Sequence, residues 1–137
     1  MPLLANDTDG GLTRKRLETY VALQEKVTVV AATDAATTQS ADALAAAGEV
    51  VYTMTPTAAR ALNTPTGAQL GTAFTDEAVG TSFRFSVVNL AAATHAITLT
   101  AGASGVTLSG VATIPANTSA SFVGVFTAAN TVVIYRK

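Results

Sequence analysis

Apolar and polar residues alternate through the second half of the chain, from about Thr81 to the C-terminus. A period of two over short runs is typical of half-buried β-strands, and here Gly, Asn and Pro clusters separate the runs. The residues expected to share a strand face are Phe83, Phe85 and Val87; Ile97 and Leu99; Val106 and Leu108; Ala112 and Ile114; Phe122 and Phe126; and Val133 and Tyr135. Six short strands at this spacing predict an antiparallel β-sandwich or a jelly-roll-like module.

The start of the chain follows a different pattern. Residues 1–11 are rich in Asn, Asp and Gly, which favour turns, so we expect a flexible arm there. Leu17, Tyr20 and Val21 are then spaced as on one face of a helix, and they predict a helix over about 12–26.

Between this helix and the second half, strands are predicted over 27–32 and 49–55, where β-branched residues gather. The Ala-rich segment 41–47 lies between them. It predicts a short helix that ends at Gly48, because Gly readily adopts the left-handed conformation found after helix ends.

A Thr-Pro-Thr sequence occurs twice, at residues 55–57 and 64–66. Thr is a good N-cap and Pro suits the first position of a helix, so each copy predicts a short helical turn. The expected turns cover residues 56–62 and 65–70. Nothing in either copy requires catalytic chemistry.

These elements predict a mainly β protein with an N-terminal helix and short helical turns. We divide it into the arm, residues 1–11; a helix-and-strand region, residues 12–63; and the β-sandwich module, residues 64–137. At 137 residues the chain is long enough for one domain with an arm.

Charge is distributed unevenly along the chain. The 51 residues from Phe85 to Tyr135 contain no Asp, Glu, Lys or Arg, although hydroxyl, amide and Gly residues interrupt them too often for a membrane span. Such a module has few groups for acid–base chemistry. Much of the apolar content is Ala, so the core of one protomer is expected to be thin and oligomerisation is favoured. The net charge of −1 gives no reason to expect nucleic-acid or membrane binding.

Candidate catalytic or metal-binding residues are few. The single histidine, His95, has no charged residue near it in sequence, so a surface or interface position is expected, with a pH switch at a subunit contact as the sharper alternative. Adjacent Asp76 and Glu77 would point to opposite faces of a strand and fit a turn better than an acid/base pair. Asp7 opens a segment faintly similar to a calcium loop, but the segment lacks the central glycine. We therefore predict a protein that is not an enzyme, with no catalytic residue, metal or cofactor.

The one cluster of like charge is Arg14, Lys15 and Arg16. Cations in the first turn of a helix oppose its dipole, so local helix stability does not explain them. A solvated helix face is one interpretation. The other, which we adopt as the candidate site, is that the triplet docks on an acidic surface of a partner protein.

The β module also resembles a module found in structural proteins of tailed bacteriophages, among them capsid decoration (cement) proteins and fibre-associated proteins. The resemblance covers about residues 64–137 and is carried by segments 80–85, 97–102, 106–110, 114–118 and 132–136. Residues 65–74 are similar to the short helical lead-in of such modules. The resemblance implies a β-rich homotrimer without enzymatic activity that bridges capsomers on the outer surface of a capsid. Its expected partners are the major capsid protein and its own copies.

The expected location is the virion. The absence of cysteine and of a recognisable signal peptide fits folding in the host bacterial cytoplasm. Two other functions remain open. A head- or tail-fibre component that binds a host-surface glycan is the main alternative. A polymer hydrolase is the other, although glycoside hydrolysis calls for two carboxylates and the β module contains none.

Overall fold

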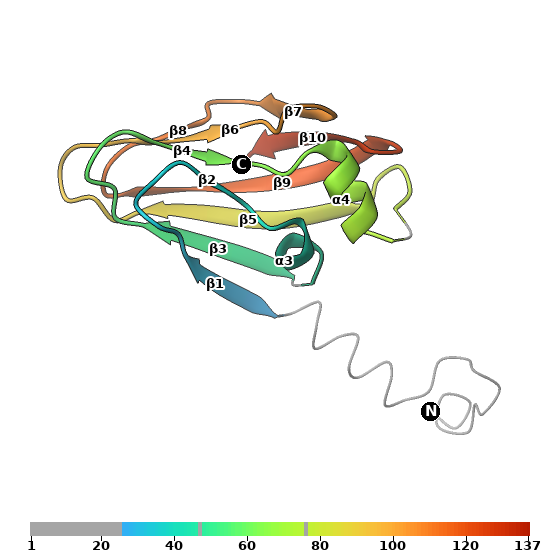
Figure 1. Cartoon of the computed structure of the whole chain (residues 1–137), viewed down its shortest axis with the longest axis horizontal. Helices are drawn as coiled ribbons and strands as arrows, with labels where there is room; N and C mark the ends of the chain where they lie inside the picture. Colours follow the sequence, from blue (N-terminus) through green and yellow to red (C-terminus); the bar gives the residue numbers. More distant parts are fainter. Residues whose placement is uncertain (1–25, 47, 76) are drawn as a thin grey trace, which may run out of the picture.

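A computed structural model describes residues 26–46, 48–75 and 77–137, and these form two β-sheets that share one hydrophobic core (Figure 1). The six-stranded sheet has the order β1 (Val27–Ala31), β3 (Glu49–Met54), β5 (Ser82–Asn89), β9 (Thr118–Ala128), β10 (Thr131–Arg136) and β7 (Val106–Ser109). The four-stranded sheet has the order β2 (Thr37–Thr38), β4 (Arg60–Asn63), β6 (Ile97–Thr100) and β8 (Thr113–Ile114). The expectation of a mainly β, sandwich-like protein is confirmed.

The chain passes from one sheet to the other after each of its first eight strands, and the first six strands form three successive units. The first unit contains β1, β2 and helix α3 (Ala41–Ala46); the second contains β3, β4 and helix α4 (Gly67–Ala73); the third contains β5 and β6. Strands of successive units lie side by side and run in parallel, with Val29 opposite Val51 and Thr37 opposite Leu62. The sheets are therefore mixed, where the sequence predicted antiparallel pairing. An alternating pattern defines strand faces but carries no information on strand direction.

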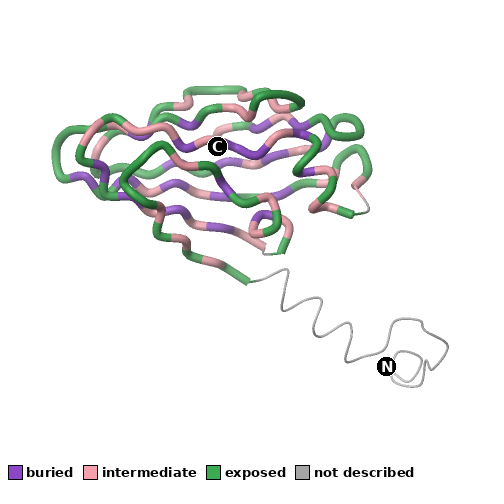
Figure 2. Tube along the Cα trace, viewed as in Figure 1, coloured by how far each residue is buried: buried purple, intermediate pink, exposed green. Residues whose placement is uncertain are grey.

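The core fills the space between the sheets, and the buried residues follow the expected alternation on most strands (Figure 2). All five phenylalanines of the chain gather in one cluster; they are Phe74, Phe83, Phe85, Phe122 and Phe126. On β10, however, Val132 and Ile134 are the buried residues, whereas Tyr135 is 43% exposed. Val133 and Tyr135 share a face of β10, as predicted, but this face points outward. The sequence does not show which face is buried, because four consecutive large apolar residues allow either choice.

Each helix contributes one leucine to the core, Leu44 from α3 and Leu70 from α4. The helices predicted over 41–47 and 65–70 both have counterparts in the structure, but α4 is capped by Thr66 rather than Thr64. The Thr66 side chain accepts a hydrogen bond from the Gln69 backbone N–H, and the Gln69 side chain accepts one from the Thr66 N–H. This capping box satisfies two helix-end donors at once.

The first Thr-Pro-Thr copy does not start a helix. Residues 60–63 form β4, which pairs with β6 and buries Leu62 beside Leu99. The predicted turn over 56–62 was wrong because burial of Leu62 in the sheet outweighs the local preference for a helix start.

Strands on both sides of the predicted boundary at residue 63 pair directly, because β3 pairs with β5 and β4 with β6. Both sheets are therefore continuous across that position. The predicted arm and almost all of the predicted helix over 12–26 lie outside the described residues.

Candidate functional site

Both sheets end with the first unit. Among the described strands, β1 pairs with β3 alone and β2 pairs with β4 alone. We call the end formed by β1 and β2 (residues 27–38) the open end. Val27 and Val29 of β1 are 56% and 65% exposed there, and β1 contains no charged residue or proline. Natural edge strands usually carry charges or proline that discourage strand addition, so an uncharged apolar edge is typical of a contact surface.

A pocket of about 220 Å³ lies between the two edge strands of the open end. Tyr52 of β3 lines it, is 3% exposed, and its hydroxyl has no hydrogen-bond partner among the described residues. Burial raises the pKa of the Tyr52 hydroxyl to about 12. The nearby Ser40 backbone lowers this pKa in part, but its position does not meet the geometry of a hydrogen bond to the hydroxyl. A buried hydroxyl without a partner is costly, so this pocket favours an incoming polar group.

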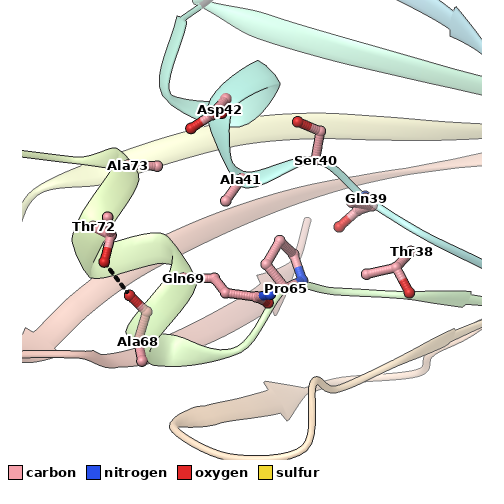
Figure 3. Close-up of a pocket in the computed structure, with 10 residues that line it drawn as sticks. All are labelled: Thr38, Gln39, Ser40, Ala41, Asp42, Pro65, Ala68, Gln69, Thr72 and Ala73. Atoms are coloured by element: carbon pink, nitrogen blue, oxygen red, sulfur yellow. Dashed lines mark hydrogen bonds between the residues drawn. The ribbon is translucent and has the colours of Figure 1, made fainter.

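A second, larger depression of about 490 Å³ lies between α3 and α4 (Figure 3). We call it the interhelix groove. Gln39, which joins β2 to α3, is 4% exposed in its wall, and neither atom of its amide group has a partner among the described residues. The groove adds hydroxyls from Ser40 and Thr72 and the carboxyl group of Asp42. Its groups suit a neutral ligand that both donates and accepts hydrogen bonds.

The unusual state of Gln39 is clear from its equivalent in the second unit, Thr64. The backbone N–H of each residue donates to the neighbouring strand at 2.8 Å, Gln39 to Asn63 and Thr64 to Thr100. The Thr64 hydroxyl also accepts from the Gly102 N–H at 2.8 Å and donates to the Pro65 carbonyl. The Thr64 hydroxyl therefore has a partner in the loop that follows β6 of the third unit, whereas the Gln39 amide has none among the described residues.

The loop after β1 is held by one ion pair. The Asp34 carboxylate accepts hydrogen bonds from the Arg60 Nε at 2.6 Å and from the Thr57 hydroxyl. The hydrogen bonds from Arg60 and Thr57 hold the pKa of the Asp34 carboxyl well below its usual range. The pair links the open end to the second unit and fixes the approach from β1 to β2.

Of the residues that the sequence singled out as candidate chemistry, the structure describes His95 and Glu77. His95 is exposed in a positive-φ conformation (76°), and its carbonyl accepts a hydrogen bond from the Asn89 side chain. Glu77 is partly buried, while Asp76 lies outside the described residues, as do Arg14, Lys15 and Arg16. The described part of the chain holds no group of three or more potential metal ligands. Within it, no helix is long and apolar enough to cross a membrane.

Sequence reasoning missed the open end and the interhelix groove. The sequence shows that Val27 and Val29 fall on the same face of a predicted strand. It does not show that this face lies outward, because that depends on tertiary packing. Gln39 carried no signal, because a lone Gln in a polar stretch is usually solvated.

The chain has no match among protein-family models, curated proteins or solved structures.

Proposed function

We propose that this chain is a structural protein that decorates and stabilises a bacteriophage capsid, as a homotrimer that bridges neighbouring capsomers. The observation that supports it best is the open end. Exposed valines, an uncharged edge strand and the unsatisfied Tyr52 hydroxyl lie together there, which is the character of a protein-contact surface.

The outer face of the six-stranded sheet fits the same role. The outward positions of β9 combine small polar residues such as Ser121 with the partly exposed Val123 and Val125. Ser86 donates a hydrogen bond to Glu49 at 2.6 Å and lies 3.1 Å from Ser121, so part of this face is already organised without a ligand. Because its side chains are already held in place, this face loses little conformational entropy when it packs against a partner.

Capsid binding stabilises the shell by mass action, since contacts made only in the assembled state favour that state. In this proposal Arg14, Lys15 and Arg16 supply the electrostatic part of docking on an acidic capsid surface. The β-sandwich then supplies the rigid body between capsomers.

Co-sedimentation with capsids that lack the protein tests the proposal. We expect saturable binding, with a fixed number of copies per capsid at saturation. Absence of binding at micromolar protein concentration would refute the decoration role.

The interhelix groove favours a second candidate, a fibre component that binds a host-surface glycan. Gln39 offers a buried donor and acceptor to sugar hydroxyls, flanked by Ser40, Thr72 and Asp42. Among the described residues that line the groove, none is an aromatic residue that would stack on a sugar. Binding of the purified protein to host cells that Gln39→Leu abolishes would support this candidate; equal binding of both forms, or none, would reject it.

A further inference from the structure

The two sheets also end together on the side opposite the open end. There β7 is the last strand of the six-stranded sheet and β8 the last of the four-stranded sheet (Figure 1). We call this the far end, residues 106–114. Residues 106–114 include no charged residue, although the Arg136 guanidinium of β10 donates hydrogen bonds to the Val111 and Thr113 carbonyls at 2.9 Å. Val111, between β7 and β8, is 67% exposed. Each end of the molecule therefore presents two neighbouring edge strands and exposed valine.

The strand directions of the two ends are compatible. In the six-stranded sheet β1, β3 and β5 are parallel, β9 reverses the direction, β10 reverses it again, and β7 is parallel to β10. β7 therefore runs in the same direction as β1. In the four-stranded sheet β8 runs opposite to β6, and hence opposite to β2. A second copy in the same orientation would place β7 parallel to β1, a kind of pairing that the protein already uses between β10 and β7. The carbonyls of Val111 and Thr113 beside β7 already accept hydrogen bonds from Arg136, so β7 supplies the strand pairing and Val111 supplies an apolar contact.

We propose that copies of this chain associate head to tail, the far end of one copy adding to the open end of the next. The inference rests on the proposed homotrimer and specifies its contact. Val111 of one copy approaches the edge that exposes Val27 and Val29 of the next. Added strands also bring main-chain donors and acceptors toward the pocket where the Tyr52 hydroxyl lacks a partner.

The alternative is a two-fold contact in which β1 pairs with β1 of a second copy. Such a contact uses the open end twice and leaves Val111 and the far end exposed. A head-to-tail contact covers both ends. Contacts of this type close into rings when the rotation between copies allows it, and three copies related by 120° form the closed trimer.

The test measures the mass of the full-length chain in solution by light scattering, for the wild type and three lysine variants. Val29→Lys places a charge on the open end and Val111→Lys places one on the far end. Val79→Lys is the matched control, because Val79 is 77% exposed and lies at neither end. We expect an oligomer for the wild type and Val79→Lys, and about the protomer mass for the other two. Circular dichroism checks folding, and Val29→Thr and Val111→Thr replace a lysine variant that does not fold.

An equimolar mixture of Val29→Lys and Val111→Lys gives the decisive result. The first variant keeps an intact far end and the second an intact open end, so one good contact forms and the mass doubles. A monomeric wild type, an unaltered mass for Val111→Lys, or no gain in mass on mixing would each overturn the inference. Capsid binding is measured separately. Failure to bind capsids by a head-to-tail oligomer refutes only the proposed function, and binding by a monomer refutes only this contact.

Discussion

Asp34 and Arg60 form a 2.6 Å ion pair between the first and second units of the fold. Asp34 follows β1 and Arg60 begins β4, so the pair holds the loop at the open end against the next unit of the sandwich. Both side chains are partly exposed, at 32% and 28%. Solvent weakens such pairs, and their contribution therefore responds to pH and salt.

Acid should remove the contribution of this pair. The pKa of Asp34 is lowered in the folded state, mainly by the Arg60 hydrogen bond and then by Thr57. A lowered pKa stabilises the fold above the unfolded value of about 3.9, and the stabilisation is lost as the pH falls below it. We expect Asp34→Asn to be less stable than the wild type at pH 6, with the difference shrinking below about pH 4.

Chemical denaturation across this pH range measures the effect. The control is the same substitution in an Arg60→Gln background, where the pH dependence due to Asp34 should be much smaller. A difference between Asp34→Asn and the wild type that is independent of pH in both backgrounds would show that the ion pair does not contribute.

Replacing Gln39 should have the opposite sign from replacing Thr64. Gln39 buries an amide without a partner, so Gln39→Met, similar in shape and apolar, should raise the free energy of unfolding by about 1 kcal/mol. Thr64→Val removes a hydroxyl that accepts from the Gly102 N–H and should lower it by about 1–3 kcal/mol. Urea denaturation measures both. Destabilisation by Gln39→Met would mean that the amide is satisfied in solution.

A methyl group at Gly124 should be poorly tolerated. Gly124 faces the Phe83 ring in the core, and a Cβ there would overlap that ring. Phe83 is packed among other phenylalanines and cannot move freely. We expect Gly124→Ala to cost about 1–3 kcal/mol of unfolding free energy. Thr127→Ala, on an exposed position of the same strand, is the control and should change stability by less than about 0.5 kcal/mol. Equal stability of the two variants would contradict the packing described here.

Neutralising Arg14, Lys15 and Arg16 together should weaken capsid binding. Replacement by Gln removes three positive charges while it retains long polar side chains. We expect at least a tenfold loss of affinity at low salt and a smaller loss at high salt, because salt screens exposed charges. Replacing Lys26 alone by Gln is the control and should have a much smaller effect. Unchanged binding by the triple variant would remove these residues from the docking surface.

Strand positions were predictable because tertiary packing agrees with local pattern on most strands. Phe83, Phe85 and Val87 alternate with polar or smaller residues, and all three are buried. At β10 the pattern left the inner face undecided, because Val133 and Tyr135 were as plausible an inner face as Val132 and Ile134. The pattern failed at β4, where a Pro-containing helix start competed with the burial of Leu62.

Strand direction and the open end could not be predicted, for one shared reason. Both depend on how successive units pair, and pairing is decided by contacts between residues such as Val29 and Val51 that are far apart in sequence. Exposure of Val27 and absence of a partner for Gln39 follow from the position of the first unit at the edge. A periodic pattern records which residues are buried, but not where a sheet ends.

The most direct test of the proposed decoration role compares the heat and low-salt resistance of virions assembled with and without this protein. We expect virions that lack it to release their genome at a lower temperature and to lose integrity in low salt, because the bridging contacts are missing. Added purified protein should restore both properties. Equal resistance of the two kinds of virion would contradict a role in capsid stabilisation.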